Sequence, residues 1–134
     1  TDQVQERDCI RAYLLRSPSV VTAGRDFGAM AGVFNCGKDG VVVGIDFFLL
    51  DENLRRINVG KGKIGVRPNS RGTTVVRCSL PRNVGPGHYQ LVMSARTRNG
   101  PTHLDRVRIQ VVKITPDDID PTLRRIMDAY RDLK

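Results

Sequence analysis

Apolar and polar residues alternate along much of this chain, in short runs that clusters of proline and glycine separate. Three such runs lie between Thr73 and Val112: TTVVRCSL, HYQLVMSAR and LDRVRIQVV. Alternation with a period of two predicts strands with one buried face, and the proline and glycine clusters predict turns. This stretch therefore predicts consecutive antiparallel strands.

The first half of the chain predicts further strands. Cys9–Thr22 predicts a first strand that Ser17-Pro18-Ser19 interrupts. Because proline belongs at a strand edge or a bulge, we expect this strand to kink or to switch from one sheet to the other. FGAMAGVFN and the more apolar Val41–Leu50 predict two more strands. LRRINV predicts a shorter strand that runs into GKGKIGV, where the glycines predict a bulge or a short edge.

The alternation also assigns a face to each position of the last three strands. The inward positions are Thr74, Val76, Cys78, Leu80, Tyr89, Leu91, Met93, Ala95, Val107, Ile109 and Val111. The outward positions include Gln90, Val92, Ser94 and Gln110. If the last two strands pair as a hairpin around Asn99-Gly100, then Arg96, Arg106 and Arg108 lie on one exposed face with Arg98 at the tip.

The period changes at Thr115. Thr-Pro-Asp-Asp is typical of a helix start, and an apolar stripe with helical spacing follows. Its members are Leu123, Ile126, Met127, Tyr130 and Leu133. A short helix is marginal alone in water, so the stripe needs a partner. We expect residues 115–134 to form an amphipathic helix that packs on the same domain, on another chain or on an adjacent domain.

The length of 134 residues suits one domain, which we place at residues 9–114 after a polar tail or linker at residues 1–8. No apolar run approaches the ~20 residues of a membrane span. The chain begins at Thr1 rather than Met, so we expect a processed product or a piece of a longer protein.

The net charge of +8 is distributed unevenly. Ten basic residues and no acidic residue lie between Asn53 and Leu104. The predicted basic surface consists of Arg55, Arg56, Lys61, Lys63, Arg96, Arg98, Arg106 and Arg108. Such a surface either keeps the domain soluble or attracts a polyanion or an acidic protein. Tyr89 is the only tyrosine, phenylalanine or tryptophan in this segment, so rings that could stack on bases are missing.

Three cysteines, Cys9, Cys36 and Cys78, form no CxxC spacing. The odd number argues against a disulfide framework and a zinc knuckle. We expect buried free thiols, while one bridge, for instance Cys36 to Cys78, stays open if the protein is exported.

Several motifs together resemble an immunoglobulin-like domain. They are Ala23-Gly24 before Phe27, then Asn35-Cys36-Gly37, FFLLDE, Leu80-Pro81 and the step Gly87-His88-Tyr89. The pattern is closest to the fibronectin type III-like and CARDB-like forms, and it covers Val20–Val112. The resemblance implies an all-β, antiparallel two-sheet sandwich to which the C-terminal helix is an addition. It also implies that Tyr89 is the corner tyrosine, whose hydroxyl bonds back to the backbone. The chain departs from antibody domains because it lacks Trp and the usual cysteine pair.

Candidate chemistry is sparse. His88 and His103 are the only histidines, and nothing in their spacing requires a nucleophile pair with Cys78. Blue copper needs two histidines beside a cysteine, and core packing explains Met93. Gly60-Lys61-Gly62-Lys63 lacks the frame of a phosphate loop, so we interpret it as a mobile basic loop. We therefore expect no catalytic residue, no metal and no cofactor.

The leading hypothesis is a non-catalytic protein-interaction module, part of a larger protein or assembly, whose partner is another protein, an adjacent domain or a second copy. The alternative is a polyanion binder whose arginine-rich face holds nucleic acid or a sulfated glycan. The fold resemblance alone implies an extracellular or periplasmic location.

Overall fold

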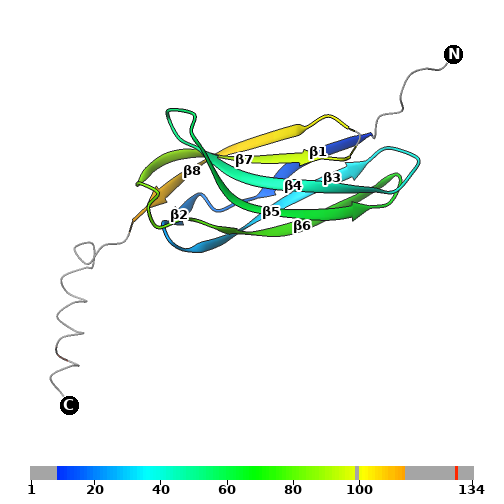
Figure 1. The fold of residues 1–134 in the computed structure, drawn as a ribbon. Helices are drawn as coiled ribbons and strands as arrows, with labels where there is room; N and C mark the ends of the chain where they lie inside the picture. The colour runs from blue at the N-terminus through cyan, green and yellow to red at the C-terminus, as the bar shows by residue number, and fades with distance from the viewer. Residues whose placement is uncertain (1–8, 99, 114–128, 130–134) are drawn as a thin grey trace.

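The computed structural model of the chain describes residues 9–98, 100–113 and 129. These residues form two packed sheets and no other layer (Figure 1). The strands are β1 (Ile10–Arg16), β2 (Val20–Thr22), β3 (Asp26–Asn35), β4 (Val41–Leu50), β5 (Arg56–Val66), β6 (Ser70–Ser79), β7 (Gly87–Arg96) and β8 (His103–Val112). The predicted all-β, two-sheet architecture is confirmed.

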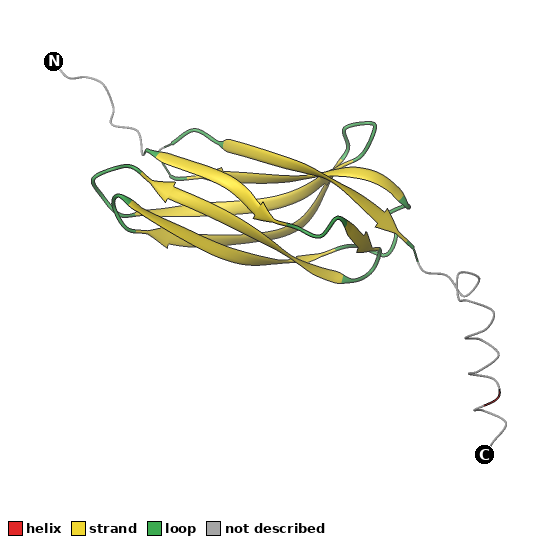
Figure 2. Cartoon of the chain, turned by 180° about the vertical axis from the view of Figure 1, so that it is seen from behind, coloured by secondary structure: helices red, strands yellow, loops and turns green. Residues whose placement is uncertain are grey.

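One sheet has the strand order β1-β3-β6, and the other has the order β2-β8-β7-β4-β5. β1 pairs with β3 in the small sheet, whereas β2 pairs with β8 in the large one. The interruption at Ser17-Pro18-Ser19 lies between β1 and β2, so the first predicted strand does switch sheets (Figure 2). All pairs are antiparallel except the short β2–β8 pair, which is parallel.

The core lies between the two sheets and follows the predicted alternation. On β4, every second side chain from Val43 to Leu49 points inward and is at most 1% exposed. Leu91, Met93 and Ala95 on β7 are fully buried as well. Each large side chain of this kind contributes roughly 1.5–3 kcal/mol when it leaves water. Val107 was assigned to an inward position, but its side chain is not buried and remains 37% exposed.

The glycine-rich stretch is neither a short edge nor a loop. β5 runs without a break from Arg56 to Val66 along the edge of the five-stranded sheet. The predicted bulge is present, because Phe47 pairs with Gly60 while Phe48 pairs with Asn58. Gly60 and Gly62 are compatible with a strand here because they face the other sheet, where a side chain has little room.

The cysteines differ from the expectation of free thiols. Cys9 and Cys36 form a disulfide with a Cα–Cα distance of 5.2 Å, and Cys78 is free and buried. The reason is the register of β1 on β3. Ile10 pairs with Asn35, and this pairing places Cys9 next to Cys36 at one end of β3. Cys78 pairs with Phe27 at the opposite end of β3 and cannot reach Cys36.

Side-chain hydrogen bonds close the ends and edges of the sandwich. Tyr89 donates its hydroxyl proton to the carbonyl oxygen of Gly85 at 2.8 Å, which is the implied tyrosine corner. The Leu14 amide on β1 donates to the Asp105 carboxylate on β8 at 2.7 Å and so joins the two sheets. The buried Asn35 amide donates to the carbonyl oxygens of Asp39 and Val66.

The predicted C-terminal helix with its apolar stripe, and the predicted tail at residues 1–8, lie outside the described residues apart from residue 129. Within the described part of the chain, we find no helix long and apolar enough to cross a membrane.

Candidate binding face on the five-stranded sheet

The bulge in β5 decides where its basic side chains point. Arg56 and Asn58 are even-numbered, whereas Lys61 and Lys63 are odd-numbered, so a regular strand would place them on opposite faces. The extra residue at the bulge reverses the alternation. As a result, Arg56 lies opposite the outward Leu50, and Lys61 lies opposite the outward Asp46. All three basic side chains therefore lie on the outer face of the sheet.

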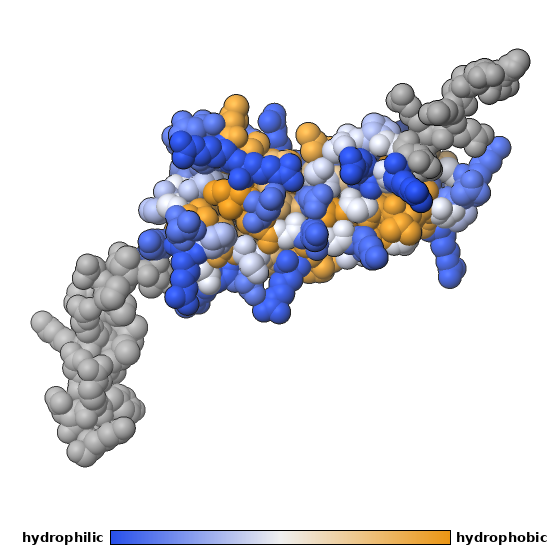
Figure 3. Space-filling model, in the orientation of Figure 1, coloured by the Kyte–Doolittle hydropathy of each residue, from blue (hydrophilic) through white to orange (hydrophobic). Residues whose placement is uncertain are grey.

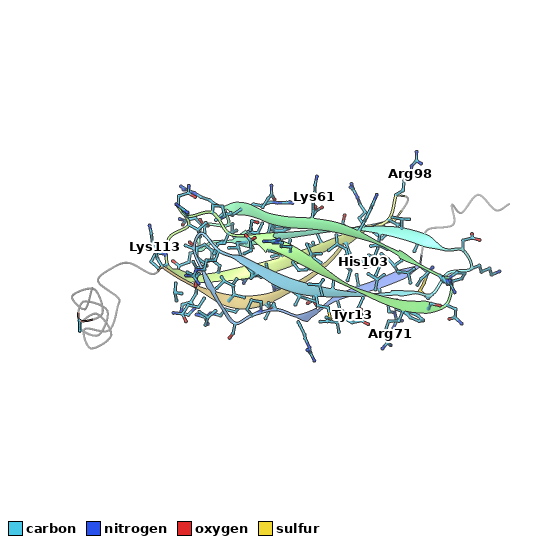
Figure 4. The ribbon with its side chains drawn as sticks, turned by 90° about the horizontal axis from the view of Figure 1, so that it is seen from below. Tyr13, Lys61, Arg71, Arg98, His103 and Lys113 are labelled. Atoms are coloured by element: carbon cyan, nitrogen blue, oxygen red, sulfur yellow. A yellow bond between two sulfur atoms is a disulfide. The ribbon has the colours of Figure 1, made fainter. Side chains whose placement is uncertain are left out.

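The β7–β8 hairpin adds basic residues to the same face. The antiparallel pairing of β7 with β8 is confirmed, with Arg106 opposite Val92 and Arg108 opposite Gln90. Arg96 lies on the same side of β7, and Arg98 follows the end of that strand. Figure 4 shows Lys61 and Arg98 projecting from one side of the sandwich and Tyr13 and Arg71 from the other.

We call this surface the basic face. It consists of Arg56, Lys61, Lys63, Arg96, Arg98, Arg106 and Arg108, all exposed. Of the eight predicted basic-surface residues, Arg55 alone falls outside it, in the loop before β5. Asp46 is the only carboxylate among the described strand positions that point outward on this sheet. The structure thus gathers on one face residues that the sequence spreads over more than fifty positions.

Cross-strand rows set the spacing of these charges. In one row, Gly44 on β4 has Arg96 on one side and Lys63 on the other. In the next row, Asp46 lies between Ser94 and Lys61. Neighbouring strands are about 4.8 Å apart, so side chains two strands apart begin roughly 10 Å from each other.

Two shallow hollows lie on this face. The first, the Gly44 hollow, has a volume of about 580 Å³, and its lining includes Val42, Gly44, Asp46, Arg56, Arg96, Arg98 and Leu104. The second, the Gln90 hollow, has a volume of about 510 Å³, and its lining includes Leu50, Glu52, Leu54, His88, Gln90, Arg106 and Arg108. The predicted hairpin surface is therefore divided between two hollows.

An apolar pair underlies the basic face where the alternation predicts only exposed residues. Val92, an outward position, is only 4% exposed. Its cross-strand partner Phe48 also points outward and is 8% exposed. The Arg56 guanidinium lies 4.0 Å from the centre of the Phe48 ring and covers it. The signal was present in the sequence as FFLL, where two adjacent rings cannot both point inward.

The residues considered for catalysis are not brought together. Cys78 points into the core from β6, and burial raises the pKa of its thiol to about 11. His88 is exposed on β7 of the other sheet. Met93 is fully buried among core side chains. Within the described ranges, no three His, Cys, Asp or Glu side chains gather as a metal site would require.

Asp26, at the start of β3, also has a shifted pKa. A hydrogen bond from Ser79, followed by the pairing with Arg77, lowers the pKa of its carboxyl. The Arg77 guanidinium approaches the carboxylate to 2.7 Å. The pair is exposed to solvent and lies on the small sheet, so it supports the local strand pairing rather than a site.

The small sheet has an apolar outer surface that sequence reasoning missed. The side chains are Tyr13 and Leu15 on β1, Met30 and Phe34 on β3, and Val75 on β6, of which Val75 is 62% exposed. Tyr13 lies over Gly32, where a Cβ would meet its ring. The signal was Met30 and Phe34 at the outward positions of FGAMAGVFN. Figure 3 shows how apolar residues remain visible between projecting hydrophilic side chains on the side that it presents.

Comparison with known proteins gives matches of fold only. No protein-family model matches the chain, and no curated protein matches it. The solved CARDB domain of a Pyrococcus furiosus protein, in complex with di-metal ions, is 13% identical with a TM-score of 0.54. That match covers 84% of this chain and 95% of the CARDB chain.

Two glycosidases also match over one part of their length. A family 123 glycoside hydrolase from Clostridium perfringens is 10% identical with a TM-score of 0.56, and the match covers 79% of this chain but 28% of the enzyme. A β-glucosidase from Listeria innocua, in complex with isofagomine, is 12% identical with a TM-score of 0.57, covering 78% of this chain and 16% of the enzyme. The chain thus shares a sandwich fold with a CARDB domain, as its resemblance to the CARDB-like form implied.

Proposed function

We propose that this chain is a non-catalytic immunoglobulin-like module of a larger protein, which binds another protein through the basic face. The observation that carries the proposal is the bulge at Val59, which brings Arg56, Lys61 and Lys63 to the side already occupied by the hairpin arginines. The bulge thus concentrates seven cations around one carboxylate on this face, and a dense patch of one sign attracts a partner of the opposite charge. The CARDB match supports a module, because it covers nearly the whole of a single domain.

The separation of Cys78 from His88 supports a non-catalytic role. Nucleophilic catalysis needs the nucleophile and its base within hydrogen-bond reach, and these two lie on different sheets. Burial also keeps the thiol protonated, which removes its nucleophilic form.

Polyanion binding is the second candidate function. The observation that favours it is the charge balance of the basic face, where seven basic side chains (Arg56, Lys61, Lys63, Arg96, Arg98, Arg106 and Arg108) surround the single carboxylate of Asp46. Nucleic acid and sulfated glycans are bound by such surfaces, with an affinity that falls steeply as salt rises.

The disulfide supports an extracellular or periplasmic location for the module. Cys9 and Cys36 are joined at the end of the β1–β3 pair. Disulfides persist in oxidising compartments and are rare where thioredoxin and glutathione keep thiols reduced.

A photo-crosslinking amino acid tests the interaction face directly. Gln90 is exposed on the basic face, in the cross-strand row that contains Arg56 and Arg108, and Thr73 is exposed on the outer side of the small sheet. In the source cells, we expect a protein to crosslink to position 90 and not to position 73, and the crosslink to disappear when Arg96 and Arg108 are changed to Glu. Equal crosslinking at both positions would contradict the assignment of the face.

Heparin and DNA distinguish the second candidate. Retention on heparin or on single- and double-stranded DNA that falls steeply between low and moderate salt, and is lost on Arg96→Glu with Arg108→Glu, supports polyanion binding. The matched control is Arg11→Glu with Arg71→Glu, which reverses two exposed charges beside Phe34 on the opposite sheet. Absence of retention at low salt ends this candidate and leaves the first.

A further inference from the structure

The floor of the Gly44 hollow is open because Gly44 has no side chain, and no neighbouring atom requires this. A Cβ built on Gly44 would find its closest neighbour, the Arg96 carbonyl oxygen, at 3.7 Å, which is ordinary contact. Glycine weakens the interior of a strand, so its place here needs another reason than packing. Space for something that lies on the sheet provides that reason.

The walls of the hollow combine two kinds of side chain. Val42 and Leu104 line the hollow and are 62% and 65% exposed, so two aliphatic side chains are left in water there. Arg96 and Lys63 flank Gly44 on the two neighbouring strands. The cations that line the hollow are Arg56, Arg96 and Arg98, and Lys63 lies just outside the lining. A ligand in the hollow thus meets arginine side chains around an open floor and two aliphatic side chains beside it.

We propose that the Gly44 hollow binds an acidic segment of a partner protein. A carboxylate of that segment is held over Gly44 beside Arg96, and an aliphatic side chain packs against Val42 and Leu104. The inference rests on the proposed function of the module and adds the chemistry of the partner. Charge complementarity selects the acid, and burial of the exposed aliphatic groups supplies affinity that charge alone does not.

A uniform polyanion fits this hollow less well. It would leave Val42 and Leu104 in water, and it would place negative charge beside Asp46, which lies in the row next to Gly44. The one ring nearby, Phe48, is covered by Arg56 and offers no face for a base or a sugar. A peptide can instead place an amide donor opposite Asp46 and a carboxylate opposite Gly44.

A steric block tests the proposal. Gly44→Val fills the floor with a residue that favours strands. The matched control is Gly65→Val on β5. Gly65 points to the same outer side of the sheet as Gly44, but it lies outside the hollow and a Cβ there meets nothing within 4 Å. Both variants should keep the melting temperature of the unaltered chain. The probe is a phage-displayed library of random dodecapeptides, selected on the unaltered chain and measured by titration as synthetic peptides.

We expect the selected peptides to contain acidic and aliphatic residues together, and to bind Gly44→Val about tenfold or more weakly while binding Gly65→Val unchanged. If the selected peptides bind Gly44→Val with the same affinity as the unaltered chain, the hollow is not the binding site, but the proposed interaction module still stands. Peptides that carry only acidic residues and that heparin displaces overturn it in favour of polyanion binding. If no peptide is enriched and position 90 crosslinks to no protein, both the inference and the proposed function fail.

Discussion

Gly60 on β5 lies against the backbone of Arg77 on β6, although the two strands belong to different sheets. A Cβ on Gly60 would come within 2.9 Å of the Arg77 carbonyl oxygen and within 3.1 Å of the Cys78 sulfur. Only glycine permits this approach without a shift of backbone. The contact closes the sandwich beside the bulge, and the bulge turns the β5 side chains onto the basic face.

Gly60→Ala should therefore destabilise the domain by about 1–3 kcal/mol, as other overpacking substitutions do. Gly65→Ala is the control, because a Cβ there meets nothing within 4 Å. Urea unfolding of the two variants measures the difference. Equal midpoints for the two would show that the sheets do not approach at Gly60.

Removal of the disulfide should lower the free energy of unfolding by about 3–4 kcal/mol. Cys9 and Cys36 are 27 residues apart in sequence, and a loop of that size gains this amount from closure in the entropic account. The measurement is denaturant unfolding of a Cys9→Ser, Cys36→Ser double variant. The unaltered chain in reducing agent should unfold at the same midpoint as the double variant. A midpoint in reducing agent equal to that of the oxidised chain would contradict the bridge.

Cys78 should make the domain less stable at alkaline pH. Burial raises the pKa of the thiol from 9.0 to about 11, so the unfolded chain loses this proton before the folded chain does. Stability is therefore unaffected below about pH 9, falls as pH rises from about 9 to 11, and loses at most roughly 2 kcal/mol in that window. The corresponding variant is Cys78→Ala, whose stability should not show this fall between pH 9 and pH 11. The variant leaves a cavity, so its free energy of unfolding is lower at every pH.

The measurement for Cys78 is the difference in free energy of unfolding between the unaltered chain and Cys78→Ala at pH 8 and at pH 11. We expect that difference to shrink with rising pH. A constant difference would mean that the thiol titrates alike in both states, and hence that it is not buried.

The arrangement of strands was predictable because each strand of a sandwich buries one face, which writes a period of two into the sequence. The runs that became β4, β7 and β8 carry most of this signal, with exceptions at Phe48, Val92 and Val107. β5 does not, since Gly60 and Gly62 occupy inward positions without any apolar side chain. Glycine is needed at these positions because β6 lies close to β5 there, and the local sequence pattern does not predict this contact.

The candidate site was half predictable for a similar reason. The charge count alone pointed to Arg56, Lys61 and Arg96, but their common face depends on the bulge and on the pairing of β4 with both neighbours. The pairing of Cys9 with Cys36 likewise follows from the register of β1 on β3. Register is a tertiary property, and a single sequence gives several registers equal support.

Amide chemical-shift mapping tests the central claim most directly, that the outer face of the five-stranded sheet is the recognition surface. A selected acidic peptide would be titrated into the isotope-labelled chain. The account predicts shifts at Gly44, Ser94 and Arg96, with none at Thr73 and Val75 on the small sheet. Shifts confined to the small sheet would contradict it.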